Sequence, residues 1–138
     1  MVAGIGIDVV AVSRIKRAAA RSGGRFLNRV YTGREREYCL ARRDPYPCLA
    51  ARFAAKEAVF KALGNGLANC RWQDVEILQA PTGTPFVRLS GGAAAIARAL
   101  GVKQVLVSLA HEKEYAAAFA VALKGVEERA AGDGAGDA

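Results

Sequence analysis

The chain has 138 residues, a formal net charge of +7 and 52% hydrophobic residues. This length suits one compact domain, and the hydrophobic share argues against global disorder. No apolar run approaches the roughly 20 residues of a membrane span, and the first ten residues lack the basic segment of a signal peptide. We therefore expect one folded domain and no membrane segment.

The positive charge is concentrated in the first third of the chain. Residues 14–43 hold ten Arg or Lys against two Glu, a local charge of +8. The segment from residue 125 carries −3, which leaves +10 on residues 1–124. Such a surface should attract nucleic acid, a phosphorylated small molecule or an acidic protein, and charge alone does not choose among them.

The first half of the chain predicts a buried strand followed by helices. Residues 2–10 are apolar or small, as in a buried strand. A helix is expected over residues 12–21, with Ser13 as a cap and a glycine pair ending it. The capping-box pattern from Thr32 to Glu35 predicts a short helix through about residue 41. After a breaker at residues 44–47, the Ala/Leu/Phe-rich stretch 47–63 predicts a long central helix.

The second half predicts a hairpin, a helix and two further strands. The hairpin spans residues 74–79 and 85–89, the helix follows Ser90 and ends at Gly101, and the strands cover 104–109 and 115–123. We expect an α+β fold: a single domain with one antiparallel sheet packed against helices. The domain should cover residues 1–124, with 125–138 as a disordered Gly/Ala/Asp-rich tail.

Three cysteines, Cys39, Cys48 and Cys70, are scattered without a CxxC or Cys/His spacing. This argues against structural zinc. We expect three unpaired thiols that pack as small buried hydrophobic residues. Free thiols favour a reducing, cytoplasmic location.

A basic stripe is expected on the first helix. Arg14, Arg17 and Arg21 recur at helical spacing, so they share one side of it, while Ile15 and Ala19 fall on another side that can pack inward. A stripe of this kind is either a solvated face or a docking surface.

Asp8 is the acid of the first strand and shares a strand face with Gly4 and Gly6. Two glycines leave space beside the carboxylate, which suggests a ligand. The alternative is an acid at the end of the strand that caps the next helix.

The central helix carries Glu57 and Lys61 four positions apart on one side. They form either an ordinary surface pair or part of a cation and phosphate site. Mg²⁺ takes one or two carboxylates together with phosphate oxygens and water, which Asp8 and Glu57 could supply. Lys61 and the turn Gly64-Asn65-Gly66 could then hold phosphate.

His111 is the single histidine and lies at the end of a predicted strand. A lone histidine is more often structural than catalytic, and no catalytic triad can be assigned from spacing alone.

These pieces together resemble a known family. Gly6-Ile7-Asp8, then Arg14, then the stretch from Arg52-Phe53-Ala54-Ala55-Lys56-Glu57-Ala58 to Gly64, looks like the holo-acyl-carrier-protein synthases, small 4′-phosphopantetheinyl transferases. Gly83-x-Pro85 and Ser108-x-x-His111 resemble later motifs of that family. The likeness covers about residues 4–123. Ala110 stands where the family usually has a second Ser, which removes a hydroxyl at that position.

The resemblance implies the phosphopantetheinyl transferase fold and transfer of the 4′-phosphopantetheine group from coenzyme A to a serine of apo acyl carrier protein, with adenosine 3′,5′-bisphosphate as co-product. Asp8 and Glu57 would hold Mg²⁺ against the pyrophosphate, and Lys61 would steady the leaving group. Glu57 would take the serine proton, directly or through a water on the metal.

The resemblance also implies binding residues and partners. The coenzyme A cleft would be lined by Arg52, Lys61, Gly64, Asn65, Gly66, Pro85, Ser108 and His111. The stripe Arg14, Arg17 and Arg21 would dock the acidic carrier protein. The family's homotrimer, with active sites between protomers, is expected here too.

Two other function classes remain at this point. A basic nucleic-acid-binding module would use the charge of residues 14–43, although it leaves Asp8 and Glu57 without a role. An inactive interaction domain on the same fold is the second, and intact Asp8, Glu57 and Lys61 argue against it. Magnesium-dependent mass gain on a carrier protein distinguishes all three.

Overall fold

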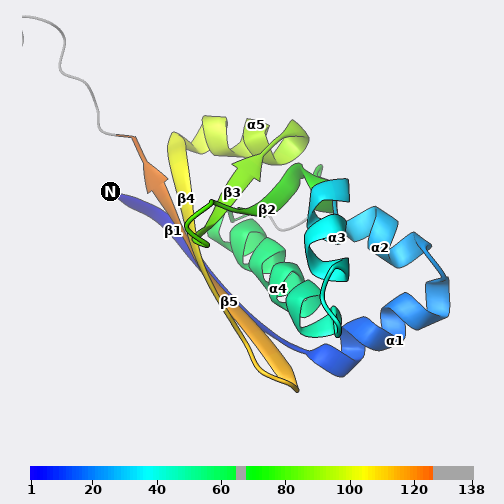
Figure 1. Ribbon diagram of the computed structural model, residues 1–138. Coiled ribbons are helices and arrows are strands. Elements are labelled where there is room, and N and C mark those ends of the chain that lie inside the picture. Colours follow the sequence, from blue (N-terminus) through cyan, green and yellow to red (C-terminus); the bar gives the residue numbers. More distant parts are fainter. Residues whose placement is uncertain (65–67, 126–138) are drawn as a thin grey trace, which may run out of the picture.

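The computed structural model describes residues 1–64 and 68–125 (Figure 1). The elements run in the order β1 (Val2–Ala11), α1 (Val12–Ser22), α2 (Arg25–Val30), α3 (Gly33–Leu40), α4 (Tyr46–Ala62), the 3₁₀ turn η1 (Trp72–Asp74), β2 (Val75–Gln79), β3 (Pro85–Leu89), α5 (Gly91–Leu100), β4 (Val102–His111) and β5 (Tyr115–Lys124). The predicted α+β class with a long central helix is confirmed. None of the described helices is long and apolar enough to cross a membrane. The predicted disordered tail lies, apart from Gly125, outside the described residues.

The strands form two antiparallel sheets, so the expectation of one sheet is wrong. The three-stranded sheet has the order β1-β5-β4, and the hairpin β2-β3 forms the second. α4 packs on β1 and β5, with the helices α1 to α3 gathered toward one end of the domain (Figure 1). The hairpin stays separate from the larger sheet because β3 contacts β4 without ladder hydrogen bonds.

Among the local signals of the first half, the capping box is confirmed, whereas the predicted cap of α1 is wrong. Thr32 and Glu35 form the reciprocal capping box that starts α3. Ser13, however, does not cap α1: the cap position is Ala11, with no side-chain hydrogen bond. β1 runs directly into α1, and the Val12 amide donates to the Glu114 carbonyl at 2.9 Å, so a neighbouring loop replaces the side-chain cap. The six-residue helix α2 was not predicted from the sequence.

Two glycines of β1 let the strand touch the backbone of α4. A Cβ built on Gly4 would lie 2.0 Å from the Ala62 carbonyl oxygen, and one on Gly6 would lie 1.9 Å from that of Ala58. The space beside Asp8, expected to hold a ligand, is therefore filled by α4 at these two glycines. The neighbouring strand β5 carries buried alanines, among them Ala118, and these small side chains let α4 pack closely on this strand as well.

A buried ion pair joins α3, α4 and β2. The Lys56 ammonium lies 2.9 Å from Glu35 Oε1, and both side chains are fully buried. Lys56 also donates to the carbonyls of Trp72 and Val75, and the Ile77 amide donates to Glu35 Oε2 at 2.8 Å. Because the donors and acceptors of both charges are matched, this polar group fixes α4 against β2 rather than loosening the core.

β1 is only half buried, contrary to the expectation of a buried strand. One side faces α4, while Ile5, Ile7 and Val9 on the other side are about three-fifths exposed, at 62%, 60% and 62%. Phe119 of β5 and Leu106 of β4 extend the same exposed apolar side. We call these five residues the outer sheet face.

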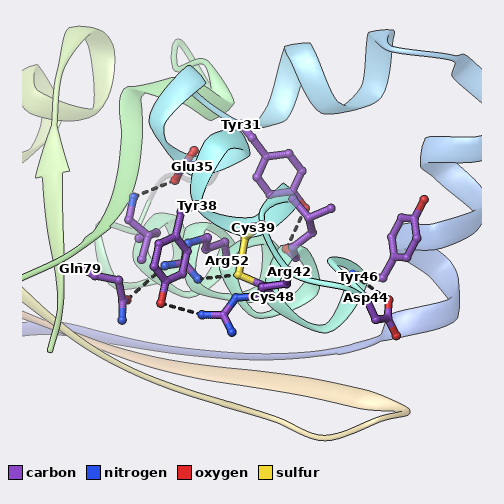
Figure 2. Close-up of a disulfide and its surroundings, with 12 residues drawn as sticks. Tyr31, Glu35, Tyr38, Cys39, Arg42, Asp44, Tyr46, Cys48, Arg52 and Gln79 are labelled. Atoms are coloured by element: carbon purple, nitrogen blue, oxygen red, sulfur yellow. Dashed lines mark hydrogen bonds between the residues drawn. A yellow bond between two sulfur atoms is a disulfide. The ribbon is translucent and has the colours of Figure 1, made fainter. Parts of the chain in front are cut away.

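Cys39 and Cys48 form a disulfide, so the expectation of three free thiols is wrong for these two (Figure 2). Cys39 lies at the end of α3 and Cys48 in the first turn of α4, and both are buried as expected. The loop between the helices turns back and brings their Cα atoms to 5.5 Å. Cys70 is the free cysteine.

The packing of β1 on α4 makes a stability prediction. Gly6→Ala places a methyl group on the Ala58 carbonyl, so the strand and the helix have to separate. We expect the free energy of unfolding to fall by about 2–4 kcal/mol, as in severe overpacking. Gly33→Ala is the matched control, since its nearest atom is the flexible end of Arg36 at 3.8 Å. Urea denaturation of both variants measures the effect; equal midpoints would contradict this packing.

Candidate active site

α4 carries the predicted chemistry on two different sides. Arg52 and Glu57 are five positions apart, which rotates them by about 140° around a helix of 3.6 residues per turn. Glu57 and Lys61 lie on the side toward β1 and α1, whereas Arg52 lies toward α3 and β2. The site therefore consists of two clusters within one chain.

The first cluster is Asp8, Glu57 and Lys61. Asp8 pairs with Ala118 inside β1 rather than ending the strand, so the alternative of a strand-end cap is wrong. Its side chain is 18% exposed and lies 3.4 Å from the Lys61 ammonium. Lys61 also donates to the Ile7 carbonyl at 2.8 Å. An ion pair this exposed contributes about 0–1 kcal/mol, so Lys61 can leave Asp8 for a phosphate at little cost.

The pKa of the Glu57 carboxyl depends on its burial and on the charge of Asp8. Burial raises the pKa of the Glu57 carboxyl above its usual value, and the negative charge of Asp8 raises it further. Lys61 and Arg14 oppose the shift. Two carboxylates that repel each other in a half-buried place are stabilised when a cation binds between them.

The donor chemistry fits Mg²⁺. Within residues 1–64 and 68–125, no group of three or more His, Cys, Asp or Glu side chains is placed to hold a metal. An all-protein metal cage is thus absent from the described part, but Mg²⁺ uses one or two carboxylates and completes its shell with water and substrate phosphates. Asp8 and Glu57 match that demand.

The second cluster surrounds Arg52. The guanidinium is buried, donates to Cys48 Sγ at 3.3 Å and to Gln79 Oε1 at 3.1 Å, and lies 4.4 Å from the Tyr38 ring centroid. Its Nε has no hydrogen-bond partner. Burial lowers the pKa of Arg52. A desolvated cation with an unused donor is suited to binding an anion.

A cavity of about 280 Å³ opens beside this guanidinium. Among the residues predicted to bind coenzyme A, it brings together Arg52, Pro85 and His111. Tyr38 and Arg42 line it as well, and neither was predicted as a site residue. Arg42 lies in the loop after α3, so its contact with the Tyr38 ring depends on the path of that loop.

Ser108 and the glycine turn are not part of this cavity. Ser108 is exposed and pairs with Phe119, which puts it on the outer sheet face rather than beside His111. Ala110, the departure from the family pattern, is exposed on the same strand. Gly64 follows α4 with a positive φ of 83°, and the predicted roles of Asn65 and Gly66 lie outside the described residues.

The basic stripe borders a groove of about 1000 Å³ between α1 and α2. Arg14 and Arg21 line it together with the rings of Phe26, Phe53 and Trp72, and Arg17 is exposed but not among the lining residues. Ile15 and Ala19 are buried, as expected from the helical period. The groove combines positive charge with aromatic surface.

Comparisons with known proteins agree with this architecture. The family model of the 4′-phosphopantetheinyl transferase superfamily matches residues 4–120. The chain is 55% identical over 123 residues to the holo-[acyl-carrier-protein] synthase of Desulforudis audaxviator, covering 89% of this chain and 94% of that protein. It resembles the solved holo-[acyl-carrier-protein] synthase of Neisseria meningitidis with a TM-score of 0.82 and 32% identity, over 90% of this chain and 100% of that one. The Helicobacter pylori synthase in complex with coenzyme A gives a TM-score of 0.76 at 28% identity, over 86% of this chain and 99% of that one.

The chain thus belongs to the 4′-phosphopantetheinyl transferase superfamily and, within it, to the holo-[acyl-carrier-protein] synthases. The resemblance predicted from the motifs around Asp8 and Glu57 is confirmed.

The coupling of the two carboxylates predicts a pH effect. A raised pKa keeps Glu57 protonated at a pH where an exposed glutamate has lost its proton, so the free carboxylate is lost as pH falls through this raised value. Burial is the larger cause and remains in Asp8→Asn, but the repulsion disappears, so we expect the Glu57 pKa to fall. NMR titration of the Glu57 carboxyl without Mg²⁺ measures it, with Glu112→Gln in the exposed β4–β5 turn as control. An unmoved midpoint in Asp8→Asn means that the carboxylates do not interact.

Proposed function

We propose that this chain transfers the 4′-phosphopantetheine group from coenzyme A to a serine of an apo acyl carrier protein and releases adenosine 3′,5′-bisphosphate. The observation that carries the proposal is the cluster of Asp8, Glu57 and Lys61 at the contact of β1 with α4. Family membership and a related synthase in complex with coenzyme A support it.

The chain's own residues divide the chemistry as follows. Glu57 accepts the proton of the attacking serine hydroxyl, and its raised pKa makes it a better base than an exposed glutamate. Lys61, half exposed and weakly held by Asp8, turns to the pyrophosphate and stabilises the leaving phosphate. Asp8 lies in the middle of β1, 3.4 Å from the Lys61 ammonium, and its negative charge reaches Glu57.

Asp8 and Glu57 are the residues that would hold Mg²⁺. When bound, the ion would offset the negative charge of the pyrophosphate during transfer.

Coenzyme A would place its anionic nucleotide end at the second cluster. Arg52 offers a buried positive charge there. Pro85 and His111 line the same cavity. We assign the 3′-phosphate to Arg52, because a planar guanidinium suits phosphate oxygens. The nucleic-acid-binding alternative leaves both clusters without a role.

The decisive experiment weighs a carrier protein. The wild type with coenzyme A, Mg²⁺ and apo carrier should add one phosphopantetheine mass to the carrier. Asp8→Ala and Glu57→Ala should each lose transfer by at least about a hundredfold, within the usual range for a catalytic acid or base, while circular dichroism stays native. The control Glu37→Ala removes an exposed carboxylate from α3. Near-normal transfer in either active-site variant would falsify the assignment.

Carrier docking is assigned to the stripe Arg14, Arg17 and Arg21, with the groove beside it. An acidic helical partner complements both its charge and its aromatic floor. Arg14 also links the two sites, because its charge reaches Glu57.

Charge reversal tests this docking surface. Since rim charges act mainly on association rate and salt dependence, Arg14→Glu with Arg21→Glu should raise the carrier KM and flatten its rise with salt. The coenzyme A KM should change little. Arg98→Glu on exposed α5 is the control. If the coenzyme A KM rises as much as the carrier KM, the stripe is not the docking surface.

We also propose that three copies of this chain assemble through the outer sheet face. A single chain separates Arg52 and His111 from Asp8, Glu57 and Lys61, and it places Ser108 among exposed apolar residues. A neighbouring copy on this face would bring one cluster of each kind together. It would also remove the exposed side chains of Ile5, Ile7 and Val9 from water.

Sedimentation tests the assembly. We expect a trimeric mass for the wild type and dissociation for Phe119→Lys, because a charge on the apolar contact cannot be solvated there. Phe86→Lys is matched, since both rings are 41% exposed and Phe86 lies on β3. A monomeric wild type at assay concentration rules out the assembly.

A cytoplasmic location stays a prediction. The prediction rested on three free thiols, and because Cys39 and Cys48 form a disulfide, Cys70 is the free thiol that still supports it.

A further inference from the structure

The disulfide lies against the proposed anion site. Cys39 and Cys48 are nine positions apart and join the end of α3 to the start of α4, which closes the intervening loop into a ring (Figure 2). That loop carries Arg42. One helical turn after Cys48 comes Arg52, whose Nη1 donates to Cys48 Sγ at 3.3 Å.

Both arginines are arranged around one aromatic ring. The Arg52 guanidinium lies 4.4 Å and that of Arg42 4.8 Å from the Tyr38 ring centroid, and Arg42 Nη2 donates to the Tyr38 hydroxyl at 2.8 Å. Arg42 is exposed and belongs to the loop that the disulfide closes. Its place therefore depends on the loop, while the place of Arg52 depends partly on the Cys48 sulfur.

Cys48 is the half of the disulfide that borders the cavity, although it is only 2% exposed. Cys48, Arg42, Arg52, Tyr38 and His111 all line the same space of about 280 Å³. Cys39, in contrast, is 0% exposed and does not line it. A small thiol entering the anion site would meet Cys48 first.

We propose that the Cys39–Cys48 disulfide is a reversible redox modification site, reduced by small dithiols, that sets the affinity of the Arg42/Arg52 subsite for the 3′-phosphate of coenzyme A. The inference rests on the proposed function, because that function places the nucleotide end of coenzyme A in this cavity.

The exchange balances as an ordinary two-step reaction. One thiolate of the dithiol attacks Cys48 Sγ, the protein S–S bond breaks, and Cys39 leaves as a thiolate that takes up a proton. The second thiol of the reagent, as its thiolate, then attacks its own mixed disulfide and releases Cys48. The protein gains two electrons and two protons, and the dithiol becomes a cyclic disulfide. Arg52 stabilises the departing Cys48 thiolate at its observed contact.

Reduction weakens anion binding for two reasons. The opened loop no longer holds Arg42, so this long side chain has to be ordered when phosphate binds. Cys48, released from Cys39, also no longer fixes the sulfur that accepts the Arg52 Nη1 hydrogen bond, so the guanidinium is held less firmly. Together we expect about a fivefold loss of affinity, the size that follows from immobilising one flexible side chain.

Calorimetry with adenosine 3′,5′-bisphosphate tests the proposal with a probe that contains no thiol of its own. The full chain is measured oxidised and after dithiothreitol, with thiols counted by alkylation and mass spectrometry of the denatured protein. Circular dichroism checks the fold in both states. The variants are Cys39→Ser with Cys48→Ser, and Cys70→Ser as the matched control with the disulfide intact.

The expected result is one alkylated thiol in the oxidised wild type, three after reduction, and a dissociation constant about five times higher in the reduced state. The double serine variant should match the reduced wild type with or without dithiothreitol, and Cys70→Ser should keep the full redox response. Three free thiols in the protein as isolated from a non-reducing preparation, or equal dissociation constants in both states, overturn the switch. If the double variant does not fold, the two states of the wild type decide.

Carrier mass gain separates this failure from failure of the proposed function. Equal binding in both states, with phosphopantetheine transfer intact, overturns the switch alone. Absence of binding in both states, together with no mass gain on the carrier, overturns the proposed function and the switch with it.

Discussion

The close contact between β1 and α4 is the constraint on which the rest of this protein depends. At Gly4 and Gly6 the strand lies directly on helix carbonyls, so no side chain separates the two backbones. Asp8 comes two residues after Gly6 on the same side of the strand. The contact therefore brings its carboxylate beside Lys61 and into electrostatic reach of Glu57. The glycines position the cluster of Asp8, Glu57 and Lys61 by letting the strand approach the helix, and not by leaving an empty pocket.

A second interaction fixes α4 from its other side. The buried pair of Glu35 and Lys56 ties the helix to α3 and β2. Lys56 is adjacent to Glu57 in sequence but points away from it, into the core. Lys56 therefore holds the helix in place, whereas Glu57 lies on the side of Asp8 and Lys61. Removing one partner of such a pair leaves a buried unpaired charge, which costs about 3–5 kcal/mol.

The proposed site is divided over the surface of a single chain. The anion cavity at Arg52, the carboxylate cluster at Glu57 and the apolar outer sheet face lie on different sides of one small domain. Coenzyme A is long and has an anionic nucleotide at one end and the transferred arm at the other. Assembly of copies would let one molecule of coenzyme A use both clusters without a larger chain.

The sequence by itself determined what depends on neighbours along the chain. The capping box at Thr32, the long helix before Gly64, the hairpin and the motif around Asp8 and Glu57 all follow from local hydrogen bonding, backbone freedom and spacing. Only the tertiary structure decided what depends on distant partners. It placed Asp8 inside a strand, split the strands into two sheets and exposed one side of β1. It also paired Cys39 with Cys48, because the loop between two helices folds back and that return is not encoded in cysteine spacing. Local patterns specify elements, whereas contacts between elements depend on how their surfaces fit once the whole chain has packed.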